Sequence, residues 1–322
     1  MCTKFFKAIS ILLSTFILVF LNPLQIFAES AVPIDPVEIA NETLQPIDGI
    51  RDNSFFVEEA YNQERGVVQH IFTARFGVDD QGPDRERTWD LSFTQEWPVF
   101  SQTHQFSFTL PYGSISSFTS EENRWMDQQD VGDLALNYRF QALWDKGITP
   151  AFSPRFTLLL PTGNDEKGFG SKVLGYQFNL PFSKTLNDRT YINLNLGFTL
   201  QPNTRIFLAN GSKSGEEDVY AFNVGGSLIY AITRDFHVLF ETLWNGNQTV
   251  EEMVDSEGNE VMVTHRFFQH DVTFLPGARM AFNLPGSIQV VPGVGIPIGL
   301  SENAIDYGAF FYLSVEHPFI RM

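Results

Sequence analysis

The six histidines are the residues of this chain best suited to bind a metal or to act as a general base, but their spacing supports neither role. His265 and His270 are five residues apart in a predicted strand, so they point to opposite faces and cannot share a metal ion without distortion. No pair of histidines has the spacing of a zinc site. The six positions are His70, His104, His237, His265, His270 and His317.

Motifs for lipid or nucleotide chemistry are also missing from the sequence. His104 is followed by Gln-Phe-Ser and not by the Ser-Asn-Gly that a membrane phospholipase would carry. Gly293, Gly295 and Gly299 resemble a dinucleotide fingerprint, but no helix is predicted to follow them. The glycine-rich residues 163–172 lack the Gly-Lys-Ser/Thr order of a phosphate loop. We therefore predict no enzyme, no cofactor and no metal, with a hydrolase kept as an alternative because a catalytic triad is defined in space.

Four charged residues fall on the polar faces of predicted strands and could act on a polar solute. Arg139 and Arg155 are on adjacent strands, and Glu241 and Asp271 are on a second adjacent pair. If the polar faces line one lumen, the two pairs lie across it and produce a transverse field that orients solutes. The alternative is that they are ordinary lumen charges, solvated or paired to a plug.

The strands are predicted from an alternation with period 2 that runs from residue 65 almost to the C-terminus. In residues 174–182 and 191–200, apolar side chains occupy every second position, with mostly polar or small residues between them. This pattern is typical of strands with one apolar and one polar face. We predict twelve strands of about 10–14 residues, long enough to cross a bilayer at the usual tilt. Their centres lie near residues 71, 92, 108, 137, 156, 177, 195, 225, 241, 272, 292 and 312.

The connections between these strands alternate between long and short. Residues 114–129, 202–217 and 248–264 are long connections, whereas residues 184–188 and 233–235 are tight turns. Short turns at one end and long loops at the other are typical of outer-membrane barrels. A bilayer offers no partner to an unpaired strand edge, so a sheet with one apolar face must close. The sequence predicts an all-β fold, a transmembrane antiparallel β-barrel of about twelve strands with short periplasmic turns and long extracellular loops.

Aromatic residues at matched intervals predict the borders of the membrane. Trp89 and Trp97 are eight residues apart on one face of a strand, which corresponds to about 20 Å along the barrel axis. Aromatic girdles flank an apolar band of roughly 25 Å in such barrels. The alternative is that these rings are core residues of a soluble β-protein. The predicted girdle residues are Trp89, Trp97, Tyr220, Tyr230, Phe236 and Trp244.

Three parts are predicted along the chain. Residues 1–28 resemble a cleaved signal peptide, because the apolar stretch at residues 9–21 follows two lysines and is too short to span a bilayer as a helix. Residues 29–64 are predicted to be a periplasmic or plug segment, and residues 65–322 the barrel. The only cysteine, Cys2, lies in the signal, so the mature chain has no disulfide. With 21 basic and 38 acidic residues, the chain is a poor partner for nucleic acid.

Residues 131–200 resemble a known family. The resemblance rests on residues 132–139 (GDLALNYR), 156–163 (FTLLLPTG), 175–177 (GYQ) and 192–197 (INLNLG). They resemble the outer-membrane transporters named for the MetA pathway of phenol degradation, a family related to the outer-membrane fatty-acid transporters. The resemblance implies a barrel that passes hydrophobic or aromatic compounds.

Pattern and resemblance together predict an outer-membrane channel or transporter for small hydrophobic or aromatic molecules in a Gram-negative-type bacterium. The expected partners are outer-membrane lipids, a small-molecule solute and, during biogenesis, the barrel assembly machinery. An outer-membrane lipid hydrolase and a structural or adhesive barrel without transport are the alternatives.

Overall fold

The computed structural model describes residues 49–50, 54–80, 84–120, 123–207, 213–254 and 260–319. The predicted signal peptide, residues 1–28, and almost all of the chain before residue 54 lie outside the described residues. Within the described ranges every regular element is a β-strand, and no helix there is long and apolar enough to cross a bilayer.

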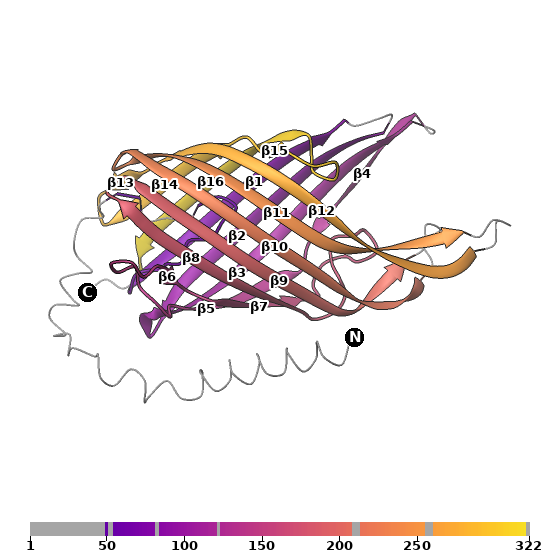
Figure 1. The fold of residues 1–322 in the computed structure, drawn as a ribbon, viewed down its shortest axis with the longest axis horizontal. Helices are drawn as coiled ribbons and strands as arrows, with labels where there is room; N and C mark the ends of the chain where they lie inside the picture. Colours follow the sequence, from indigo (N-terminus) through magenta and orange to yellow (C-terminus); the bar gives the residue numbers. More distant parts are fainter. Residues whose placement is uncertain are drawn as a thin grey trace. The chain divides into compact units, whose positions relative to one another are not determined.

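The described residues contain sixteen strands, which Figure 1 labels in chain order. Their bounds are β1 Val67–Asp79, β2 Arg85–Val99, β3 Ser101–Thr119, β4 Arg124–Val131, β5 Leu134–Phe140, β6 Ala151–Phe152, β7 Arg155–Leu160, β8 Gly175–Asn187, β9 Thr190–Phe207, β10 Lys213–Thr233, β11 Phe236–Val254, β12 Glu260–Met280, β13 Phe282–Leu284, β14 Ile288–Gly295, β15 Ile298–Gly299 and β16 Tyr307–Pro318.

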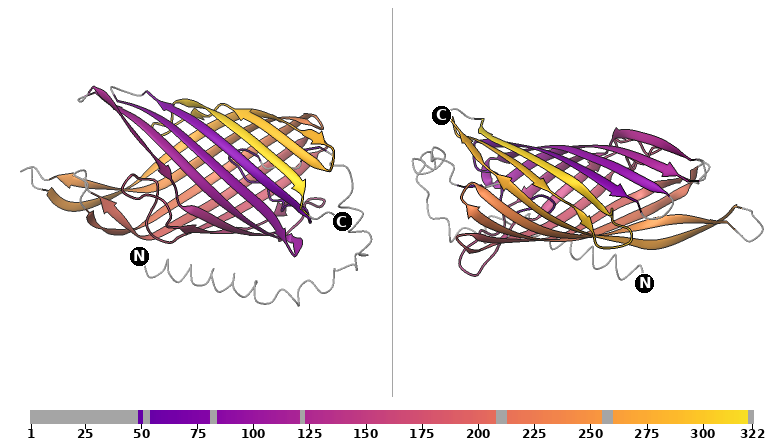
Figure 2. Two further views of the ribbon diagram at one scale, coloured as in Figure 1. Left: turned by 180° about the vertical axis from the view of Figure 1, so that it is seen from behind. Right: turned by 90° about the horizontal axis from the view of Figure 1, so that it is seen from above.

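The strands form a closed antiparallel barrel, because the first strand pairs with the last. β1 and β16 are in register from Val67 opposite Pro318 to Val78 opposite Tyr307. β4 continues into β5, β6 into β7, β12 into β13 and β14 into β15, so the sixteen pieces make twelve passages. Figure 2 shows these tilted passages from two further sides. The predicted twelve-stranded antiparallel barrel is confirmed.

The alternation in the sequence places polar side chains inside the barrel and apolar ones outside. On β9, Asn193 and Asn195 are 2% and 4% exposed, whereas Leu194 between them is 54% exposed. On β11, Glu241 is 1% exposed beside Phe240 at 47%. Soluble proteins bury their large apolar side chains, so this reversed pattern is the one expected of a membrane barrel.

Several strands are longer than the roughly 10–14 residues expected from a bilayer crossing. β10 and β12 each have 21 residues, and β3 has 19. Figure 1 shows β11 and β12 running on together beyond the rest of the barrel at one end. Part of each long connection is therefore paired strand. The alternation with period 2 is lost in these stretches of the sequence, so their pairing could not be predicted from it.

The two ends of the barrel differ in their connections. At one end, which we call the short-turn end, a single residue joins β2 to β3 and residues 188–189 join β8 to β9. At the opposite end, the hairpin end, residues 161–174 join β7 to β8. Val67 and Pro318 are paired at the short-turn end, so the barrel begins and finishes there.

Candidate functional site

Residues 54–64, which we call the inner segment, lie inside the barrel just before β1. An extended chain has no internal hydrogen bonds, so its buried backbone amides need acceptors from the surrounding wall. Inward side chains supply them at 2.6–3.0 Å. The N–H groups of Phe55 and Phe56 donate to Glu241, that of Glu58 to Asn195, that of Ala60 to Ser183, that of Asn62 to Gln141 and that of Gln63 to Gln105.

These acceptors follow one another around the barrel wall. As the inner segment runs from residue 55 to residue 63, it meets Glu241 on β11, Asn195 on β9, Ser183 on β8 and Gln105 on β3. At its start, the hydroxyl oxygens of Ser54 and Ser227 are 3.1 Å apart. The wall therefore fixes both the path and the register of the inner segment.

The inner segment separates two cavities of the lumen. The hairpin-side cavity has a volume of about 810 Å³, and residues 54–58 form part of its lining. The short-turn-side cavity has a volume of about 370 Å³ and is lined in part by Glu59 and residues 61–64. Burial, with nearby Asp145 and Glu59, raises the pKa of Tyr61 to about 12, so its hydroxyl stays protonated. The inner segment therefore lines both cavities, with residues 54–58 on one side and residues 59 and 61–64 on the other.

The two predicted arginines hold the inner segment. Arg139 and Arg155 are directly opposite each other on β5 and β7. The Arg139 guanidinium donates to the carbonyls of Glu59 and Tyr61 at 3.2 and 2.9 Å and lies 3.6 Å from the carboxylate of Glu96. Arg155 forms an ion pair with Glu58 of the inner segment. The structure thus brings both arginines to one contact surface.

The two predicted acids are not placed together. Glu241 accepts the amide hydrogens of Phe55 and Phe56 at 2.8 and 2.6 Å. Asp271 instead accepts a hydrogen bond of 2.9 Å from Asn245 on the neighbouring strand β11. Arg139 and Arg155 each lie close to a carboxylate, so part of their charge is compensated locally. The transverse field across the lumen stays a prediction.

Sequence reasoning missed several charged partners in the lumen. Glu58 and Glu59 are consecutive in the inner segment and reach Arg155 on β7 and Arg279 on β12, the latter at 3.4 Å. Glu96 lies on the inward face of β2. Strand alternation could have identified Glu96 and Arg279, but no pattern in the sequence pairs them with their partners.

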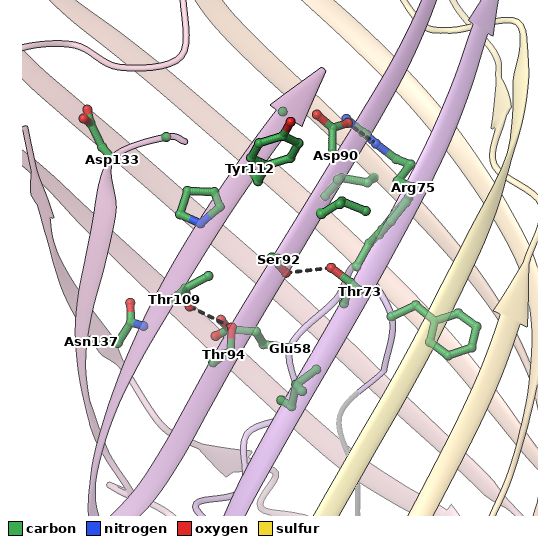
Figure 3. A pocket seen from close by; sticks show the side chains of 18 of the residues that line it. Glu58, Thr73, Arg75, Asp90, Ser92, Thr94, Thr109, Tyr112, Asp133 and Asn137 are labelled. Carbon is green, nitrogen blue, oxygen red and sulfur yellow. Dashed lines mark hydrogen bonds and ion pairs between the residues drawn. The ribbon is translucent and has the colours of Figure 1, made fainter. Parts of the chain in front are cut away.

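The hairpin-side cavity has one apolar and one hydroxyl-rich wall. Its apolar floor is the ring of Phe55 with Phe310 and Tyr312, at centroid distances of 5.1 and 5.4 Å. On β1 to β3, Figure 3 shows Thr73 facing Ser92 and Thr94 facing Thr109, with oxygen separations of 2.6 and 2.8 Å. Nearer the hairpin end, Arg75 donates to Asp90 at 2.6 Å (Figure 3).

Two glycines make room for the aromatic floor. A Cβ atom at Gly293 would lie 2.7 Å from the Phe55 ring, and one at Gly277 would lie 2.6 Å from it. We expect Gly293→Ala to displace this ring and to destabilise the barrel by about 1–3 kcal/mol, the usual cost of overpacking. The midpoint of heat-induced unfolding on gels measures the effect.

Gly226→Ala is the matched control, because its Cβ would meet only Leu194 at an ordinary 3.6 Å. Equal midpoints for Gly293→Ala and Gly226→Ala would contradict the close approach of Phe55.

The connection at residues 161–174 is held inward by the motif that carries the family resemblance. Between β4 and β5, Asp133 accepts hydrogen bonds from the amides of Gly163 and Ser171, both at 2.9 Å. A Cβ at Gly113 on β3 would lie 2.5 Å from the Phe169 ring. Phe169 and its neighbours then line the hairpin-side cavity, which narrows that mouth of the lumen.

His104 and Ser107, the pair closest to a hydrolase motif in the sequence, point to opposite faces of β3. His104 faces outward and its Nδ1 is 2.7 Å from the Tyr138 hydroxyl, whereas Ser107 faces inward and bonds to Asn137. Among the described residues no three His, Cys, Asp or Glu side chains come together as metal ligands.

The six predicted girdle aromatics lie on the outward faces of β2, β10 and β11. Trp89 and Tyr230 are 42% and 41% exposed. Trp97 stacks on Phe106, with ring centroids 6.1 Å apart. Trp97, Tyr230 and Phe236 are near the short-turn end, and Trp89, Tyr220 and Trp244 are farther along the same strands towards the hairpin end. Their role as a membrane girdle stays a prediction.

Comparison with solved structures shows two barrels of similar architecture. An outer-membrane channel from Pseudomonas putida F1 is 13% identical with a TM-score of 0.57, and the match covers 80% of this chain and 97% of that chain. The transport unit of the autotransporter AIDA-I from Escherichia coli is 10% identical with a TM-score of 0.51, covering 87% and 97%. The fold is that of an outer-membrane barrel. At these identities the likeness concerns the fold alone.

Sequence comparisons add no family. No family model matches the chain, and no curated protein matches it. The resemblance to the phenol-degradation transporters therefore stays a prediction.

Proposed function

We propose that the protein is an outer-membrane channel for small molecules, exported by a cleaved signal peptide at residues 1–28 and closed in this state by the inner segment. The divided lumen carries this proposal, because an inside-out barrel encloses two cavities with the inner segment between them. A purely structural barrel needs no such barrier. By analogy with other outer-membrane barrels, the short-turn end faces the periplasm. We propose no catalytic role for the described residues.

We infer that the solute is small, hydrophobic or aromatic, and without negative charge. The floor formed by Phe55, Phe310 and Tyr312 suits stacking with a ring. Arg75 and Arg155, which line the hairpin-side cavity, are each paired with a carboxylate. An anion would have to displace that carboxylate, whereas a neutral solute would not.

Swelling of proteoliposomes tests this proposal with solutes that do not cross lipid unaided. We expect faster swelling in phenyl glucoside, which has a neutral ring, than in the ring-free methyl glucoside or in the anion phenyl phosphate. Protein-free liposomes are the control. Equal rates for the two glucosides would refute selection for aromatic solutes. No swelling above the control in any solute, from either the wild type or a variant that lacks residues 54–64, would refute the channel.

A further inference from the structure

Two histidines meet on the outer face of the seam that closes the barrel. The pairing of Val68 with His317 and of His70 with Val315 puts both histidines on the outward side of β1 and β16. Their Nε2 atoms are 3.1 Å apart, across 247 residues of sequence. Both side chains are partly exposed, and they lie at the beginning of β1 and the end of β16, close to the short-turn rim.

The distance between the two nitrogens is close to that required by a metal ion. With Zn–N bonds of about 2.0–2.1 Å and tetrahedral angles, two imidazole ligands of one zinc ion are roughly 3.3–3.4 Å apart. The observed 3.1 Å separation needs a change of only a few tenths of an ångström. A hydrogen bond between neutral imidazoles and a shared metal ion are therefore both compatible with this arrangement of the rings.

The hydrogen bond that His317 makes fixes the tautomer that a metal ligand requires. Its Nδ1 is 3.1 Å from the carbonyl oxygen of Pro318, so Nδ1 carries the proton and Nε2 presents its lone pair. His70 is held by the ring of Phe93, stacked at 6.2 Å and 9°. In a neutral His70 the proton moves from Nε2 to Nδ1 when a metal binds, so binding requires no net loss of a proton.

We propose that His70 and His317 form a two-imidazole site for a divalent cation of the zinc type, which clamps β1 to β16. No third His, Cys, Asp or Glu joins them in the described part of the chain, so water completes the coordination and the site is weaker than a structural zinc centre. Because the two strands come from opposite ends of the barrel sequence, a bound ion closes a long loop and favours the closed barrel.

Heat-induced unfolding of the purified barrel in detergent, prepared without a polyhistidine tag, tests the site. We expect excess ZnCl₂ to raise the unfolding midpoint of the wild type by several degrees relative to EDTA, with about one zinc ion bound per chain. His70→Ala and His317→Ala should abolish this rise. His104→Ala is the control and should keep it, since His104 is an outward histidine paired with Tyr138.

Each variant is compared with itself in zinc and in EDTA, so a loss of basal stability does not disturb the result. If either alanine variant fails to fold, His317→Gln is its replacement. If zinc does not raise the unfolding midpoint of the wild type, the contact between His70 and His317 is only a hydrogen bond between imidazoles. If zinc still raises the midpoint of both alanine variants, the ion binds elsewhere. Either outcome overturns the proposal and leaves the channel proposal unaffected.

Discussion

Deleting the inner segment, residues 54–64, is expected to raise the single-channel conductance of the barrel several-fold. Its removal joins the cavities of about 810 and 370 Å³ into one continuous path. The barrel should still form, because its closure depends on strand pairing from β1 through β16 and not on the inner segment. Planar-bilayer recordings of the wild type and the deletion measure the change.

The converse experiment uses an engineered disulfide to hold the inner segment in place. The hydroxyl oxygens of Ser54 and Ser227 are 3.1 Å apart, and the only native cysteine is Cys2. In Ser54→Cys/Ser227→Cys, oxidation should tie the inner segment to β10 and suppress the channel openings expected of the wild type. Reduction should restore them, and the single variant Ser227→Cys should not respond to oxidant. Unchanged conductance in the deletion would show that the inner segment is not the barrier.

Arg139→Ala is expected to have the second largest effect. The substitution removes the ion pair with Glu96 and the bonds to the inner-segment carbonyls of Glu59 and Tyr61. It also leaves the buried Glu96 carboxylate without its cation, a change that typically costs about 3–5 kcal/mol. We expect a lower unfolding midpoint on gels together with more frequent channel openings, because the lost contacts include those that hold the inner segment.

Two further variants separate these effects. Arg155→Gln removes a half-buried ion pair with Glu58, so it should increase openings with a smaller loss of stability. Asp271→Asn is the control, since Asp271 bonds to Asn245 on the neighbouring strand and should alter neither property. If Arg139→Ala lowered the midpoint without more openings, its contacts would be structural only.

The barrel could be predicted from sequence because a bilayer imposes a simple rule on every strand. Leu194 must face lipid and Asn195 must face the lumen, so period 2 is visible without knowledge of any partner. Strand ends were harder to predict, since the period of 2 is lost in the sequence of the long connections. The positions of all twelve passages nevertheless agree with the predicted centres.

The candidate site was predictable only in part. Alternation placed Arg139 and Glu241 on polar faces, and the structure finds both in contact with the inner segment. The sequence of the inner segment, residues 54–64, shows no hydrophobic period. Side chains from several strands hold it, so its path is set by the barrel wall and not by a repeat in its own sequence. Its two glutamates therefore could not be assigned to Arg155 and Arg279.

The attachment of the inner segment also sets an order of events during biogenesis. It immediately precedes β1, yet its anchors extend to Glu241 on β11 and Arg279 on β12. The inner segment is synthesised before any of the strands. Its docking surface nevertheless forms only when nearly the whole chain has been synthesised and folded into the barrel. Closure of the lumen by the inner segment is consequently a late step. An intermediate in which β11 and β12 are not yet part of the barrel lacks the anchors that hold the inner segment.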